Sequence, residues 1–132
     1  MTGVRLGQNL LALSTSKGGL FIFDINLQNR RDKMIFKYSH SQEISHLEWG
    51  VSENSIALFF VDDSGLVFSV PLMKLKSLFF SPENIYKSDS TVVQILYENN
   101  MLLVSSLSKC VVVNLNKQNS ITQIGSQLRD GR

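Results

Sequence analysis

One cysteine and two histidines are the side chains best suited to chemistry in this sequence. Cys110 is the single cysteine of the 132 residues, so it can form no internal disulfide. It begins the apolar run Cys110–Val113, where a buried, inert thiol is commoner than a nucleophile. His40 and His46 have no cysteine or third histidine near them, and this spacing does not match a zinc site. These residues predict neither a catalytic centre nor a metal site.

Two glycine-containing segments resemble ligand loops only in part. Asp62-Asp63-Ser64-Gly65 could suggest a calcium loop, but the further carboxylates and the terminal glutamate of an EF-hand are missing. Ser16-Lys17-Gly18-Gly19 lacks the spacing of a phosphate-binding loop, and no helix is predicted after it. Because aspartate, serine and glycine favour tight turns for backbone reasons, both segments are predicted to be hairpin turns.

Two further segments could bind partners. The basic cluster Arg30–Lys33 is expected in a loop between two strands, as a solvated segment or alternatively as a lipid or phosphate contact. Phe79 and Phe80 lie in a long predicted loop and are weak candidates for a protein contact; packing over the edge of a sheet is an equal alternative. No other partner-binding residue is predicted.

An enzyme would need polar side chains that converge on one point. If the chain were a hydrolase or a ligand-binding enzyme, the available candidates would be Glu43, His46, Glu98 and Asn99. None of them belongs to a recognisable catalytic motif, and His46 is expected to lie on the strand face opposite Leu47. The sequence therefore predicts a protein that is not an enzyme and that uses no cofactor.

The composition indicates a single globular unit over residues 1–132. Hydrophobic residues make up 43% and charged residues 18%, which suits a protein with a core. The net charge of +2 gives no strong field for binding nucleic acid. No apolar run approaches the roughly 18–20 residues that span a bilayer, and no export signal is recognisable. With one cysteine, a reducing cytosol is the expected compartment.

A hairpin pattern occurs three times along the chain. Two short apolar runs flank a turn in each of residues 10–25, 55–72 and 101–116. With Leu20, Leu66 and Cys110 taken as equivalent, the repeat spacings are 46 and 44 residues. Such periods are typical of propeller blades of about 40–50 residues.

The segments beside each hairpin complete the blades. Glu43–Gly50 and Thr91–Glu98 alternate apolar and polar residues and are predicted to be innermost strands. The predicted outer strands are Met34–Ser39, then Leu78–Phe80 or Ile85–Tyr86, and Ile121–Ile124. Pro71–Phe80 could form at most one helical turn.

The predicted fold is thus all-β, with about three four-stranded antiparallel blades over residues 10–39, 43–86 and 91–125. The first blade is expected to begin at its second strand, Leu10. Because a ring usually takes about four to eight blades, the ring is incomplete and a fragment of a longer protein is expected. Sheet faces that no neighbouring blade covers should make the isolated chain prone to nonspecific association.

Details at the predicted blade corners resemble WD-repeats. His40 precedes Ile44 and Trp49 at spacings similar to those of the conserved histidine and aromatic positions of these repeats, with Ser39 in place of glycine. Phe23-Asp24 resembles the Trp-Asp dipeptide, whereas Val70-Pro71 and Val113-Asn114 stand at the equivalent places. The resemblance implies a degenerate WD-repeat propeller in which His40 connects strands by hydrogen bonds.

The last 40 or so residues resemble the N-terminal propeller of the Hermansky-Pudlak syndrome 5 protein family. The matching positions are Val92, Val93, Gln94, Tyr97, Leu102–Leu107, Lys109, Ile124, Gly125 and Arg129–Gly131. Asn114 departs from that pattern, which tends to have aspartate there, and Cys110–Val113 is more aliphatic than usual. A family of large proteins with tectonin β-propeller repeats is the alternative resemblance.

The first resemblance implies a non-catalytic scaffold. It would be a subunit of the second biogenesis-of-lysosome-related-organelles complex, which directs endosomal cargo to pigment granules and similar compartments. Its partners would be the other protein subunits, with no nucleic acid. Its place would be the cytoplasm, peripheral to endosomal membranes through those partners. The alternative resemblance implies autophagy and secretory-pathway sorting.

Overall fold

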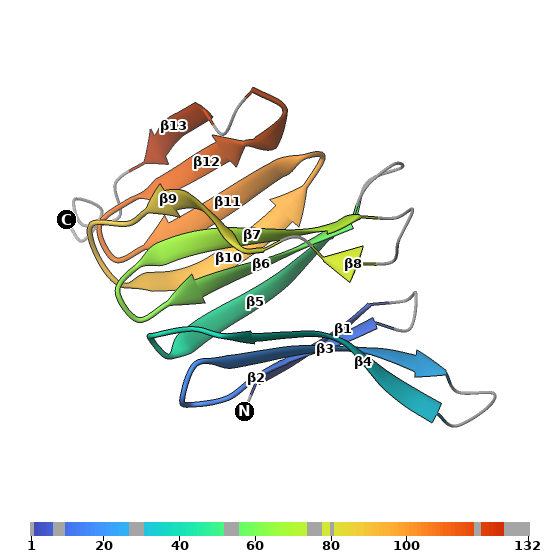
Figure 1. Ribbon diagram of the computed structural model, residues 1–132. Helices are drawn as coiled ribbons and strands as arrows, with labels where there is room; N and C mark the ends of the chain where they lie inside the picture. The colour runs from blue at the N-terminus through green and yellow to red at the C-terminus, as the bar shows by residue number, and fades with distance from the viewer. Residues whose placement is uncertain are drawn as a thin grey trace.

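Three antiparallel sheets follow one another along the chain in the computed structural model (Figure 1). The structure describes residues 2–6, 10–26, 31–51, 56–73, 78–79, 81–117 and 120–125. Within these ranges, side chains are described except at 2–6, 25–26, 31–33, 72–73, 78–79, 117 and 125.

The first sheet has the strand order β1-β2-β3-β4, each strand paired with the next along the chain. Its strands are β1 (Thr2–Leu6), β2 (Leu10–Ser14), β3 (Gly19–Asn26) and β4 (Arg31–Ser39). The first blade therefore begins at β1, which corrects the predicted start at Leu10. Two apolar residues in Thr2–Leu6 give a weak strand pattern, and the pairing of this segment along all of β2 makes it a strand.

The second and third sheets repeat this arrangement. The second contains β5 (Ile44–Val51), β6 (Ile56–Asp62), β7 (Leu66–Met73), β8 (Leu78–Phe79) and β9 (Glu83–Lys87). The third contains β10 (Val92–Glu98), β11 (Met101–Ser106), β12 (Cys110–Asn114) and β13 (Ser120–Gly125), with a short 3-10 helix, η2 (Leu115–Lys117), before β13. The predicted all-β fold with four-stranded antiparallel blades is confirmed.

The outer edge of the second sheet is built from two short strands. β8 pairs with Leu72 and Met73 of β7, and β9 pairs with Leu66–Ser69 of the same strand. Both predicted alternatives for this edge are therefore present. Because β7 continues through Pro71 to Met73, the helical turn allowed for Pro71–Phe80 is wrong in the described part of that segment.

The turns define which residues of the three blades are equivalent. Gly18 and Gly65 occupy the same turn position, with φ of +86° and +89°. Leu20, Val67 and Cys110 each form the first strand pair beyond their turns, opposite Ser14, Val61 and Ser105. The repeat spacings are therefore 47 and 43 residues, and Leu66 lies on the face of β7 opposite Val67 because side chains alternate along a strand.

Two cores separate the three sheets. The first lies between the first and second sheets, with Ile22 and Leu58 in it, and the second lies between the second and third sheets. Successive residues of β6 serve both: Leu58 and Phe60 face the first core, whereas Phe59 and Val61 face the second. The sequence of β6 is a continuous apolar run because both faces of this strand are buried.

The sheets form an arc in the part of the chain that the structure describes. The first and third sheets each pack on the second, and β5 contacts both β1 and β10 (Figure 1). β5 and β10 are thus innermost strands, as predicted, and β1 is the third. The predicted incomplete ring of about three blades is confirmed.

Candidate functional site

His40 and Asp62 form a buried pair where the first blade passes into the second. His40 Nε2 lies 2.7 Å from Asp62 Oδ2, and the two side chains are 7% and 1% exposed. Because an ionised carboxylate only accepts hydrogen bonds, Nε2 carries the proton and donates it. The His40 ring also packs edge-on against Phe60 and Phe68. The role that the WD-repeat resemblance implied for His40, connecting strands, is confirmed.

Asp62 also organises its own hairpin turn. Its Oδ1 accepts hydrogen bonds from Ser64 N at 2.9 Å, Ser64 Oγ at 2.7 Å and Leu66 N at 3.1 Å. Burial by itself would raise the pKa of Asp62, but hydrogen bonds from His40, Ser64 and Leu66 lower it below 3.8. The prediction of a turn for Asp62–Gly65 is confirmed, and the carboxylate points into the protein.

This lowered pKa makes the stability of the protein sensitive to acid. A carboxyl whose pKa is lower in the folded state stabilises fully above its unfolded pKa and loses that contribution as pH falls through its folded pKa. We expect Asp62→Asn, which cannot ionise, to be less stable than the wild type near pH 5. The difference should shrink as pH falls below about 3.9, the unfolded pKa of an aspartate. Urea unfolding across this range measures it, and a constant difference would contradict the assignment.

The next blade junction has the same backbone with a different set of side chains. His40 N donates to Gly18 O at 2.8 Å, and Ser88 N donates to Gly65 O at 2.9 Å in the equivalent place. Ser88 thus stands where the first junction has its histidine. Ser106, which is 3% exposed, stands at the position equivalent to Asp62.

Serine hydroxyls replace the histidine–aspartate pair at this second junction. Ser88 Oγ donates to Ser90 O at 2.7 Å, and Ser90 Oγ lies 2.8 Å from Ser108 Oγ. Asp89 accepts from Ser108 Oγ and pairs with Lys109 Nζ at 3.2 Å. These two contacts hold the pKa of Asp89 below its usual value. Both junctions are therefore polar networks that join neighbouring blades.

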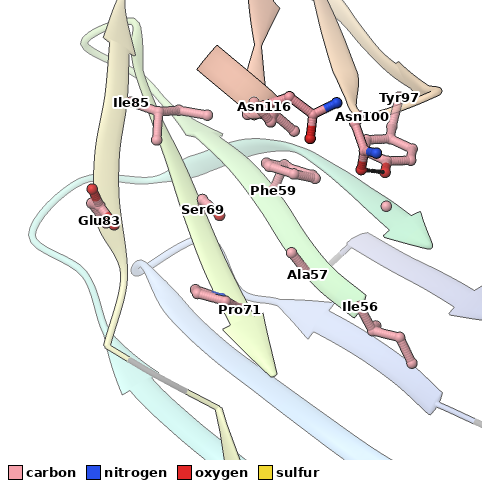
Figure 2. A pocket seen from close by; sticks show the side chains of 12 residues that line it. Ile56, Ala57, Phe59, Ser69, Pro71, Glu83, Ile85, Tyr97, Asn100 and Asn116 are labelled. Carbon is pink, nitrogen blue, oxygen red and sulfur yellow. Dashed lines mark hydrogen bonds between the residues drawn. The ribbon is translucent and has the colours of Figure 1, made fainter. Parts of the chain in front are cut away.

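An open cleft lies between the second and third sheets at the opposite end from these junctions (Figure 2). Its volume is about 280 Å³. β9 supplies Glu83 and Ile85 on one side, and the β10–β11 hairpin supplies Tyr97 and Asn100 on the other (Figure 2). The floor and rim are mixed apolar and polar, lined by Gly50, Ile56, Ala57, Phe59, Ser69, Pro71, Leu115 and Asn116.

The cleft wall on the third sheet is held rigidly. Tyr97 stacks on Phe59 with ring centroids 5.8 Å apart, and its hydroxyl donates to Asn100 Oδ1 at 2.8 Å. Asn99 and Asn100 have φ of +52° and +61°. Asparagine tolerates this conformation and so forms the tight two-residue turn between β10 and β11. The polar groups of this wall are therefore fixed in place before any ligand binds.

The four residues named for an enzyme do not converge. His46 Nε2 lies 3.2 Å from Val93 O, and Glu48 Oε2 accepts from Tyr97 N, so β5 and β10 run side by side in the same direction. Glu43 precedes β5 at one end of the blades, whereas Glu98 and Asn99 end β10 at the other. His46, on the face opposite Leu47 as predicted, bridges the second and third sheets.

The remaining predicted residues have less defined places. Cys110 begins β12, but it is half-buried rather than buried, with its sulfur 3.3 Å from Ser105 Oγ. Phe79 belongs to β8, where its side chain is not described, and Phe80 lies outside the described residues. Arg30 also lies outside them. Arg31 to Lys33 belong to β4 rather than to a loop, because β3 extends to Asn26 and pairs with Arg31.

Sequence reasoning missed both the partner of His40 and the cleft. The available signal for the pair was an aspartate at the end of an apolar run, in the blade that directly follows the histidine. The cleft brings together residues from six elements and from the β10–β11 turn, and it has no local pattern. Among the described residues, no three histidine, cysteine or acidic side chains gather as metal ligands would. The described helical segment is too short to cross a membrane.

Comparison with known proteins adds one sequence relative. No protein-family profile matches the chain. The human tectonin beta-propeller repeat-containing protein 2 is 28% identical over an alignment 127 residues long, which covers 92% of this chain and 9% of that protein. The chain thus spans less than a tenth of its curated relative.

Solved structures show the same fold. The WD40 domain of SCAP from fission yeast matches with a TM-score of 0.67 at 15% identity, over 96% of this chain and 32% of that one. A periplasmic gluconolactonase of Pseudomonas aeruginosa matches with a TM-score of 0.60 at 8% identity, over 95% and 38%. The sheet order and the two blade junctions agree with these structures. The chain therefore forms about three consecutive blades of a WD-repeat-like β-propeller.

Proposed function

We propose that the chain is a non-catalytic protein-interaction module of a membrane-trafficking protein. The observation that supports the proposal is where the polar side chains of the chain make their contacts. His40, Asp62 and His46 are engaged in contacts between blades, whereas the cleft beside Tyr97 is open and preformed. A rigid scaffold that presents a preformed hollow is suited to binding a partner.

The size and charge of the cleft suit a side chain of a protein partner. About 280 Å³ is at the small end of ligand pockets, which span roughly 300–1,000 Å³. Glu83 is the one charged residue among those lining the cleft, so a neutral or basic side chain is favoured. Ile85 and Phe59 supply apolar surface for its stem.

The resemblance of residues 91–131 to the Hermansky-Pudlak syndrome 5 family supports the specific role. In this role the protein acts in the cytoplasm, peripheral to endosomal membranes, as a subunit of the second biogenesis-of-lysosome-related-organelles complex. Its partners are the other subunits of that complex. The match to the tectonin-repeat protein favours the second candidate, a scaffold for autophagy and secretory sorting. The likeness to a gluconolactonase concerns the fold.

Filling the cleft tests the module. Asn116 is exposed at the rim, and we expect Asn116→Trp to reduce recovery of the complex subunits with the tagged protein about tenfold, equivalent to about 1.4 kcal/mol. Gln123→Trp, equally an exposed residue of the third sheet but outside the cleft, is the matched control. Quantitative mass spectrometry of immunoprecipitates from pigmented cells measures both.

The outcomes test the binding site and the trafficking role separately. Equal recovery with both variants would place the contact away from the cleft and leave the complex assignment standing. If autophagy proteins are recovered in place of the named subunits, the second candidate is correct. Recovery of neither set, with the wild-type protein folded, would overturn the trafficking role.

A further inference from the structure

The cleft between the second and third sheets has one carboxylate and no cationic side chain. Glu83, on β9, is the one charged residue among those that line the cleft, and it is exposed. In the part of the chain that the structure describes, no side chain forms an ion pair or a hydrogen bond with its carboxylate. Glu83 therefore gives the cleft a negative charge that a ligand can neutralise.

Several other polar groups of the cleft are hydrogen-bond acceptors. Tyr97 Oη donates its proton to Asn100 Oδ1 at 2.8 Å, so both oxygens can offer only lone pairs to a ligand (Figure 2). Ser69, on β7, adds a hydroxyl that can also accept. The amide N–H groups of Asn100 and Asn116 are the side-chain donors nearby, and they carry no charge. Together with Glu83, these acceptors favour a ligand that is cationic and rich in donors.

The acceptors on the third sheet are held in position by backbone contacts. Leu115 N donates to Asn100 O at 3.0 Å, which ties η2 to the turn between β10 and β11. Gly50, in β5, leaves the space that the ring of Tyr97 occupies, because a Cβ there would lie 2.7 Å from Tyr97 Cδ2. A ligand therefore meets groups that are already ordered, which lowers the entropic cost of binding.

We propose that the cleft binds an arginine side chain of the protein partner. This inference rests on the proposed function, since it specifies what the interaction module recognises. The planar guanidinium carries five N–H donors, so it can pair with both oxygens of Glu83 and still reach other acceptors. It also stacks on aromatic rings, of which Tyr97 supplies one. A lysine ammonium is a compact, strongly hydrated point charge and gains less from this arrangement.

The hollow at the second blade junction lacks this selectivity. Its volume is about 330 Å³, similar to that of the cleft, but Asp63, Lys87 and Asp89 line it together. Charges of both signs therefore face the same space, and Asp89 is already paired with Lys109 at 3.2 Å. Only the cleft beside Glu83 combines a single unpaired charge with neutral acceptors among the described hollows that contain an acidic residue and an aromatic ring.

Selection from a peptide library tests the ligand. A display library of random peptides is selected on the tagged chain, and peptides that also bind Asn116→Trp, whose cleft is filled, are removed. We expect the retained peptides to share one arginine. Because every amino acid occurs at every position of the library, a preference for lysine, for an acidic residue or for an apolar one would be equally visible and would contradict the proposal.

Affinity measurements then test the contact with Glu83. For a labelled synthetic peptide from this selection, Glu83→Gln is expected to weaken binding roughly tenfold, and so is lysine in place of the arginine of the peptide. Glu43→Gln is the matched control, because Glu43 is also exposed but lies at the opposite end of the blades. It changes the net charge equally and should alter the affinity less than about twofold. Fluorescence anisotropy gives the dissociation constants.

A charge exchange separates loss of the ion pair from loss of the fold. Glu83→Lys should no longer bind the arginine peptide. The same peptide with glutamate in place of arginine should bind Glu83→Lys roughly tenfold more tightly than it binds the wild type. An unfolded variant could not gain affinity in this way.

The results distinguish this inference from the proposed function. If the retained peptides share no arginine, or if Glu83→Gln binds the arginine peptide as tightly as the wild type does, the arginine assignment is overturned and the cleft remains a binding site. If no peptide distinguishes the wild type from Asn116→Trp, the inference fails with the cleft itself. Recovery of the complex subunits in immunoprecipitates then decides the trafficking role separately.

Discussion

Asp62→Ala is expected to lower the free energy of unfolding by about 3–5 kcal/mol, which is the usual effect of removing one partner of a buried pair. The substitution leaves the His40 ring, whose side chain is 7% exposed, without its carboxylate. It also removes the acceptor of Ser64 N and Leu66 N in the turn. Since small domains are stable by about 5–15 kcal/mol, the loss would be a large part of the total.

Asp63→Ala is the matched control for this prediction. Asp63 is the next residue and is exposed, and its backbone N–H donates to Glu43 O, a bond that alanine retains. A change within about 0.5 kcal/mol is expected. Urea unfolding at one protein concentration, followed by the fluorescence of the single tryptophan, Trp49, measures both variants. Equal losses in the two would show that the His40–Asp62 pair does not stabilise the corner.

Gly18→Ala is expected to lower the free energy of unfolding by about 2–5 kcal/mol, for a conformational and a steric reason. Gly18 has φ of +86°, and an L-residue pays about 1–2 kcal/mol in this conformation. The new Cβ would also overlap the carbonyl oxygen of His40 and lie 2.8 Å from that of Gln42. Because both obstacles are backbone atoms, relief requires the whole blade junction to shift, which adds a cost of about 1–3 kcal/mol.

Gly65→Ala separates the cost of the backbone conformation from the cost of the steric overlap. Gly65 has nearly the same φ, +89°, but its Cβ would meet Ser88 O at 3.1 Å, which is tight rather than overlapping. We expect about 1–2 kcal/mol from conformation alone. Guanidinium unfolding of the two variants gives the difference, which is the steric contribution at the first junction. If Gly65→Ala lowered the free energy of unfolding more than Gly18→Ala does, the close contacts at Gly18 would not explain the destabilisation.

The hairpins and their order could be predicted because they depend on local patterns. Apolar runs separated by Ser16–Gly19 and Asp62–Gly65 specify strand, turn and strand within about 15 residues. Repetition of the pattern then indicates blades. Assigning equivalent residues was harder, because the start of an apolar run does not reveal which face a residue occupies. Leu66 and Val67 are both apolar, and only the strand pairing shows that Val67 is equivalent to Leu20.

The candidate site was much less predictable. The role of His40 followed from a resemblance, but its partner Asp62 is 22 residues away, and no local rule relates a histidine to a particular turn. The cleft depends on Glu83 and Asn100 reaching the same space from different sheets. Whether two such residues come close together depends on the angle between the packed sheets. No periodic pattern in the sequence predicts that angle.

The all-β class, the three hairpins and the tight turns thus follow from the sequence alone, because they depend on side-chain alternation and on the backbone preferences of glycine and aspartate. The packed structure was needed to show that β1 completes the first blade, that the two junctions use different polar networks, and which faces stay open. Those features arise from contacts between segments distant in the chain. Their stability depends on burial, and burial exists only once the sheets have packed.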